Sequence, residues 1–183
     1  MRNLIALLLV WMFFALIHEG AHAATAMALD EYAGFHVRGF GLEVTFKTSL
    51  DERSGFKWTL ISGTSNLITI ALGYGCYAIR RRFISSRHLI VVALGYWLCI
   101  LFLTLDPLNL IIGPFIYGGD AMGIAAGLNV SPRLIQGASL LIFLINREIV
   151  AHRVLPDFGI STRHPLFRPW LPVRTSTSPK KQG

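Results

Sequence analysis

Four long runs of apolar residues dominate the chain, at residues 4–28, 58–79, 89–113 and 133–151. Each is close to the roughly 20 residues that an α-helix needs to cross a lipid bilayer. Polar and charged residues lie mainly between the runs. The pattern therefore predicts an all-α membrane protein with about four transmembrane helices.

The segment between the first two runs has a different period. In the stretch HVRGFGLEVTFK, Leu42, Val44 and Phe46 alternate with Glu43, Thr45 and Lys47. Alternation at every second residue is typical of a half-buried β-strand, so we expect a small β-hairpin after the first helix. An open strand at the membrane edge could bind an unwound peptide through its backbone, although a hairpin without a ligand is an equal alternative.

A second irregular stretch, DPLNLIIGPFIYGGD at residues 106–120, contains Pro107, Pro114 and three glycines. Proline removes a helical hydrogen bond, so this composition predicts a broken loop before the last helix. Non-helical backbone at membrane depth is tolerated where it lines a cavity, and we therefore expect the loop to surround a site. The alternative is an ordinary turn at the membrane surface.

Composition agrees with a membrane protein, because 53% of the 183 residues are hydrophobic and only 15% are charged. Absence of a linker or repeat in the sequence predicts a single domain at residues 1–151, followed by a basic, proline-rich tail at 152–183. We expect a multi-pass protein of the cell (inner) membrane. The net charge of +7 is explained by lipid headgroups, so no nucleic-acid partner is expected.

The first apolar run contains the motif His18-Glu19-x-x-His22. Residues four apart lie about 40° from each other on a helix, so both imidazoles can reach one metal ion. H-E-x-x-H is typical of zinc sites in which the glutamate takes a proton from a water molecule beside the metal. Two alternatives are hydrogen bonding within a helix bundle and, for Ala-x-Ala at residues 21–23, a signal-peptide cleavage site. Ionisable groups inside a membrane favour a functional role.

A zinc site needs a third ligand, and the acidic candidates near other apolar runs are Asp106 and Asp120. The second run begins with a small polar cluster, Ser62-Gly63-Thr64-Ser65-Asn66. Successive helices run antiparallel, so Asn66 is expected at the depth of the two histidines. Close packing of helices through small residues is the alternative explanation of this cluster.

These motifs resemble those of the site-2 protease family of intramembrane zinc metalloproteases, over roughly residues 4–125. The family has H-E-x-x-H in one span, small-Gly-x-x-x-Asn in the next and Asn-x-x-Pro-x-Pro-x-Leu-Asp-Gly in a third. The first two motifs match in order, although two residues instead of three separate Gly63 from Asn66 in the second. In the third, Asn109 and Pro114 match, Ile112 replaces the first proline, Asp120 comes three residues late and Ala121 replaces the glycine.

The resemblance implies that His18, His22 and Asp120 hold one zinc ion per chain. It implies that Glu19 is the general base and that Asn66 binds the substrate backbone or the developing oxyanion. The expected partners are the lipid bilayer and a transmembrane protein substrate, cut in or near its membrane segment, with a second membrane protein as a candidate regulator. Asp106 remains an alternative third ligand.

Two other classes of function use the same residues. A catalytically inactive membrane scaffold would retain a metal-binding site without proteolysis, although a structural site has no need of Glu19. A transporter component would use the histidine and aspartate residues as an ion path, although four spans without an internal repeat are few for a transporter.

The orientation of the chain follows from its basic residues. With four spans, twelve of the 17 lysines and arginines lie on the face that holds the N-terminus, the 80–88 loop and the tail. The positive-inside rule places that face in the cytoplasm, whereas the family resemblance implies the opposite orientation. The arginines at 80–82 directly follow a predicted span, so we expect a cytoplasmic tail.

A cysteine that replaces Ser178, in a chain lacking Cys76 and Cys99, tests this orientation. We expect no labelling by an impermeant thiol reagent on intact cells and full labelling after permeabilisation, because a cytoplasmic tail is shielded by the membrane. Labelling on intact cells would instead support the orientation that the family resemblance implies.

Overall fold

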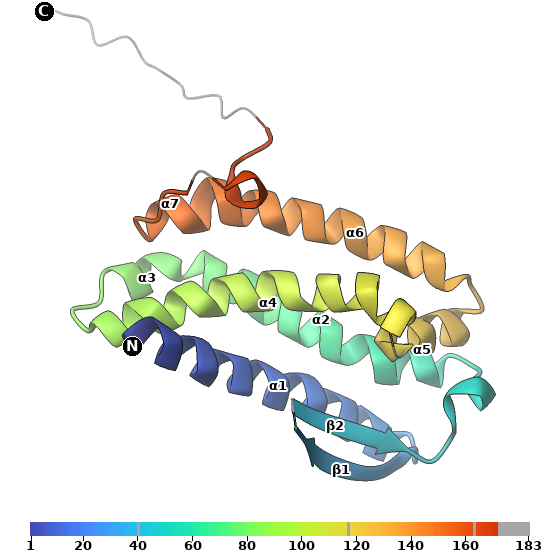
Figure 1. Ribbon diagram of the computed structural model, residues 1–183. Helices are drawn as coiled ribbons and strands as arrows, with labels where there is room; N and C mark the ends of the chain where they lie inside the picture. Colours follow the sequence, from blue (N-terminus) through green and yellow to red (C-terminus); the bar gives the residue numbers. More distant parts are fainter. Residues whose placement is uncertain (40, 117, 163, 172–183) are drawn as a thin grey trace, which may run out of the picture.

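The computed structural model describes residues 1–39, 41–116, 118–162 and 164–171. It is a helical bundle with a two-stranded hairpin beside one end of the first helix (Figure 1). The helices are α1 Arg2–Ala28, α2 Lys57–Ala78, α3 Arg80–Ile84, α4 Leu89–Ile116, α5 Gly119–Leu128, α6 Pro132–Ile149 and α7 Leu155–Asp157. The strands are β1 Tyr32–Arg38 and β2 Gly41–Phe46. The predicted helical class and the hairpin after the first helix are confirmed.

Three helical segments of the described chain are long and apolar enough to cross a membrane: Arg2–Ala28, Leu89–Ile116 and Pro132–Asp157. The helix α2, with 22 residues, matches the predicted second span in position but is not among them. Its polar residues face other helices, where Ser62, Ser65, Asn66 and Thr69 are buried. Compatibility with a membrane is therefore shown by three helices, and the fourth span stays a prediction.

Glycines let the helices around α2 approach closely. A Cβ atom on Gly73 would lie 2.8 Å from the carbonyl carbon of Phe102, so the backbones of α2 and α4 are in direct contact. On α5, Gly127 lies against the backbone and hydroxyl of Thr59, and Gly123 lies against the side chain of Ser62. The helix α5 is therefore held tightly on α2, while α6 lies across α4 from α1 (Figure 1).

The predicted interruption of the helix by prolines is wrong, because α4 continues through Pro107 and Pro114 to Ile116. Proline 107 cannot donate to the carbonyl of Leu103, four residues earlier. Asn146 on α6 supplies the missing donor, with its Nδ2 2.7 Å from Leu103 O. The chain breaks only after α4, where Gly118 has a φ of +86°. A long-range hydrogen bond thus keeps α4 helical.

The last long helix runs past residue 152, where the sequence places the start of the tail. The last long helix continues through a π-helical turn, Val150–Val154, and α7 to Asp157. Beyond it the chain returns to α6, where Arg147 lies 3.8 Å from the ring of Trp170 and donates to the carbonyl of Pro165. Residues 172–183 of the predicted tail lie outside the described residues.

The hairpin is antiparallel, with Phe35 opposite Val44. The side chain of Val44 is buried and Phe46 packs edge-on against Trp58, with 5.6 Å between the ring centroids. The predicted inward residues of this strand therefore do face the helices. Its base is anchored by Glu31, which accepts hydrogen bonds from Lys57 and from the Thr48 hydroxyl; the bond from Lys57 lowers the pKa of the Glu31 carboxyl.

Two glycines on α2 provide a matched test of the packing. Gly73→Ala should lower the free energy of unfolding by about 1–3 kcal/mol, because its Cβ would overlap the α4 backbone. Gly75→Ala should be neutral or stabilising, because nothing lies within 4 Å of the added atom and alanine favours the helix. Thermal unfolding of both variants in one detergent measures the difference. Equal stabilities would contradict the close contact.

Candidate metal centre

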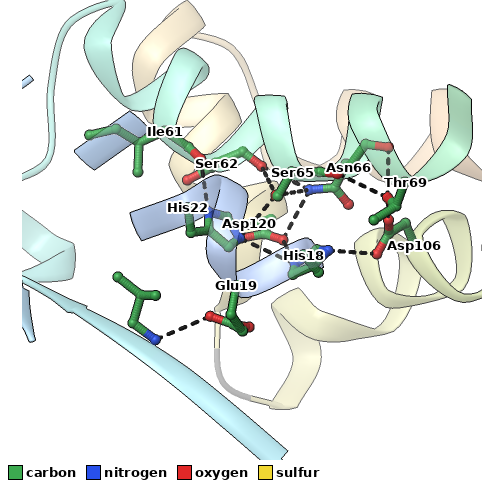
Figure 2. A network of polar contacts seen from close by, with 11 residues as sticks. His18, Glu19, His22, Ile61, Ser62, Ser65, Asn66, Thr69, Asp106 and Asp120 are labelled. Atoms are coloured by element: carbon green, nitrogen blue, oxygen red, sulfur yellow. Dashed lines mark hydrogen bonds and ion pairs between the residues drawn. The ribbon is translucent and has the colours of Figure 1, made fainter. Parts of the chain in front are cut away.

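Three potential metal ligands converge in the bundle. The Nε2 atoms of His18 and His22 lie 3.2 Å apart. An oxygen of Asp120 lies 3.2 Å from the first and its other oxygen lies 3.1 Å from the second. Figure 2 shows the two imidazoles from α1 meeting the Asp120 carboxylate from α5. A group of two histidines and one carboxylate at these separations could hold a metal ion.

Local structure explains how these residues meet. His18 and His22 are one helical turn apart on α1 and both are buried. Asp120 lies in the first turn of α5, directly after Gly118 and Gly119, whose φ angles are +86° and +55°. Glycine adopts these angles without a steric penalty, so the chain reverses after α4 and returns Asp120 to α1.

The second ring nitrogen of each histidine also lies close to an oxygen atom, at hydrogen-bond geometry for His22 and at ion-pair distance for His18. The Nδ1 atom of His22 lies 2.8 Å from the carbonyl oxygen of Ile61 on α2. The Nδ1 atom of His18 lies 3.0 Å from Oδ1 of Asp106 on α4. Contacts of this kind orient an imidazole and leave its opposite nitrogen for a metal. Both Nε2 atoms are thereby directed toward Asp120.

A polar face of α2 completes the cluster. Asn66 Nδ2 donates to Asp120 Oδ2 at 3.0 Å, and Ser65 Oγ lies 3.0 Å from His22 Nε2 (Figure 2). The amide oxygen of Asn66 is buried and has no hydrogen-bond partner among the described residues. In these contacts Asn66 orients the Asp120 carboxylate, and its expected contact with a substrate stays a prediction.

The structure separates the two aspartates that the sequence left as alternatives. Asp120 joins His18 and His22 in the cluster, whereas Asp106 lies at the opposite nitrogen of the His18 ring. Asp106 is almost fully buried and accepts a hydrogen bond from the hydroxyl of Thr69. The position of Asp120 is that of a metal ligand, and the position of Asp106 is that of a residue that supports His18.

Sequence reasoning missed Thr69. Its signal is the spacing of polar residues along α2, where Ser62, Ser65, Asn66 and Thr69 follow the i, i+3, i+4, i+7 pattern of one helix face. Ser65, whose hydroxyl contacts His22, lies on the same face of α2. A polar stripe inside an otherwise apolar helix indicates a face that is buried against other polar groups.

Glu19 lies beside the cluster rather than in it. Its Oε2 atom accepts a hydrogen bond from the backbone nitrogen of Val44 on β2, at 3.1 Å. In Figure 2 its carboxylate points toward the strand, away from Asp120. Val44 lies opposite Phe35 of β1. Because its N–H donates to Glu19, this N–H points to the outer edge of β2.

Two cavities meet at Glu19. The larger, of about 850 Å³, is lined by the cluster, by β2 and by the segment that includes Arg53. The smaller, of about 420 Å³, lies between α1 and α4 and is mainly apolar, with Trp11, Phe14, Leu105 and Ile112 in its wall. His18 and Glu19 line both cavities. The larger cavity, which is the more polar of the two, thus adjoins an apolar groove at the candidate site.

Comparisons with protein-family models, with curated proteins and with solved structures found no match to this chain.

Removal of the Asp120 carboxylate tests the metal centre. The purified wild-type protein should bind about one divalent metal ion per chain, and Asp120→Ala should weaken binding by more than about 100-fold, the upper end of what loss of a supporting partner causes. Chelator competition followed by elemental analysis measures both.

Asp157→Ala is the control for this change, because Asp157 pairs with Arg80 far from the cluster and its loss should leave metal affinity unchanged. Wild-type affinity in Asp120→Ala would show that Asp120 is not a ligand.

Proposed function

We propose that the protein is an intramembrane zinc metalloprotease, which hydrolyses a peptide bond in or near a transmembrane segment of another membrane protein. The observation that carries the proposal is the meeting of His18, His22 and Asp120 beside Glu19, at the junction of a polar cavity and an apolar groove. The resemblance of the motifs to site-2 proteases supports the same reaction.

The ligand set suits zinc. The two Nε2 atoms lie 3.2 Å apart, and each lies 3.1–3.2 Å from a different oxygen of Asp120, close to the roughly 3.3 Å between donor atoms on a tetrahedral zinc ion. Two imidazoles and one carboxylate leave a fourth position for water or substrate, as is usual in catalytic zinc sites. When bound, the ion would supply Lewis acidity and lower the pKa of a nearby water molecule.

Glu19 is the proton carrier in the proposed reaction. Its carboxylate takes a proton from water as the water oxygen adds to the carbonyl carbon of the substrate. It then gives that proton to the nitrogen of the scissile bond, so that the C–N bond breaks and an amine leaves. The position of Glu19 in the walls of both cavities supports access to water and to substrate.

The outer edge of β2 is suited to hold an unwound substrate. Residues Gly41–Phe46 line the larger cavity, and an extended peptide can add to such an edge through backbone hydrogen bonds. A substrate strand that takes over the Val44 N–H would release Oε2 of Glu19 for proton transfer. The apolar groove between α1 and α4 accepts side chains of the kind found in membrane segments.

The proposed setting is the cell membrane, with the substrate reaching the site within the bilayer. Three described helices have the length and composition to cross it. Asn66 is proposed to steady Asp120 and, as the family resemblance implies, to bind the substrate backbone or the developing oxyanion. A regulatory membrane protein remains a candidate partner.

Glu19→Gln tests the reaction, because glutamine preserves the shape of the side chain but cannot accept the proton. We expect the variant to keep about one zinc per chain and to lose proteolysis by at least about 100-fold. The assay reconstitutes the protein with a mixture of single-pass transmembrane proteins in lipid vesicles and identifies new N-termini by mass spectrometry.

Glu52→Gln provides the control, since Glu52 is exposed and lies outside both cavity walls. It should cleave as the wild type does. Wild-type cleavage by Glu19→Gln would rule out the proposed role of Glu19, and absence of cleavage with bound zinc in the wild type would favour an inactive metal-binding scaffold.

A further inference from the structure

We infer that Asp106 is a positioning residue that holds His18 in place for the metal and strengthens its bond to the ion, with Thr69 fixing Asp106. The inference rests on the proposed zinc site and assigns a role to a carboxylate that is not itself among the ligands. The supporting contacts connect three helices, from Thr69 on α2 through Asp106 on α4 to His18 on α1.

Each oxygen of the Asp106 carboxylate faces a different residue. Asp106 Oδ1 lies 3.0 Å from Nδ1 of His18, and its Oδ2 accepts a hydrogen bond from the Thr69 hydroxyl. Each carboxylate oxygen therefore has its own partner. The relative exposure of Asp106 is 1% and that of Thr69 is 0%, so solvent does not compete for these contacts.

Geometry excludes Asp106 as a ligand of the same ion while the ring keeps this orientation. The two nitrogens of an imidazole point away from each other, and Nε2 of His18 is the one directed at His22 and Asp120. Asp106 contacts the other nitrogen. A carboxylate on that side accepts the N–H proton, fixes the tautomer and increases the electron density at the metal-binding nitrogen.

The two histidines are supported differently. His22 Nδ1 faces the neutral carbonyl of Ile61, whereas His18 Nδ1 faces the carboxylate of Asp106. A carboxylate attracts the imidazole N–H more strongly than an amide carbonyl does, so we expect His18 to be the stronger metal ligand of the two. An ionisable side chain is costly in the middle of an apolar helix such as α4, and this role accounts for its presence there.

The test is the zinc affinity of the purified full-length protein, measured by chelator competition. Asp106→Ala should bind zinc about 10–100-fold more weakly than the wild type. Asp106→Asn retains an acceptor but loses the charge, so its affinity should lie between the two, about tenfold below the wild type. Thr69→Val should weaken binding less than Asp106→Asn does, because it removes only the hydroxyl that fixes Asp106.

Cobalt substitution distinguishes positioning from direct ligation. With Asp106 as a positioning residue, Asp106→Asn saturated with cobalt should keep the visible absorption intensity of the four-coordinate wild type, whereas Asp120→Asn should not. Leu103→Ala controls for general damage to α4: Leu103 is fully buried one turn away, in a cluster with Val150 and Val154, and its loss should lower thermal stability without changing zinc affinity.

Three results would overturn the inference. Wild-type zinc affinity in Asp106→Asn would show that the charge has no effect, and this isosteric variant keeps the test valid if Asp106→Ala does not fold. A cobalt spectrum altered as in Asp120→Asn would make Asp106 a ligand. Absence of zinc binding by the wild type would overturn the proposed zinc site together with the inference, whereas the first two results would leave that site standing.

Discussion

The need to satisfy ionisable groups inside an apolar bundle determines the arrangement of this protein. His18, His22 and Asp120 come from two helices that are far apart in sequence, and each is costly to bury alone. Their mutual separations of 3.1–3.2 Å show how the fold meets that requirement. The chain reversal after α4, the polar face of α2 and the position of α5 all follow from it.

Rigid support around the cluster comes from close helix packing at glycines. Gly73 brings α2 onto α4, and Gly123 brings α5 onto the Ser62 face of α2. The outer nitrogens of the histidines are held by Ile61 and Asp106, on two different helices. A site held in this way is organised before any ligand binds, which reduces the free energy needed for reorganisation.

The surroundings of the cluster give the proposed chemistry its setting. Glu19 lies where the larger, more polar cavity and the apolar groove meet, and its contact with Val44 links it to the edge of β2. Proteolysis of a membrane segment needs water and apolar substrate at one place, because the bilayer core excludes water. The described arrangement brings both environments to the same carboxylate.

The local features of the chain were predictable from its sequence because they depend on neighbouring residues. The turn of a helix sets His18 and His22 on one face, and the two-residue period of a strand predicts the hairpin. Tertiary contacts decided the rest. Asn146 on α6 keeps α4 helical through Pro107, and reversal at Gly118 brings Asp120 rather than Asp106 to the cluster. These outcomes depend on donors and backbone angles supplied by distant segments, which local spacing does not encode.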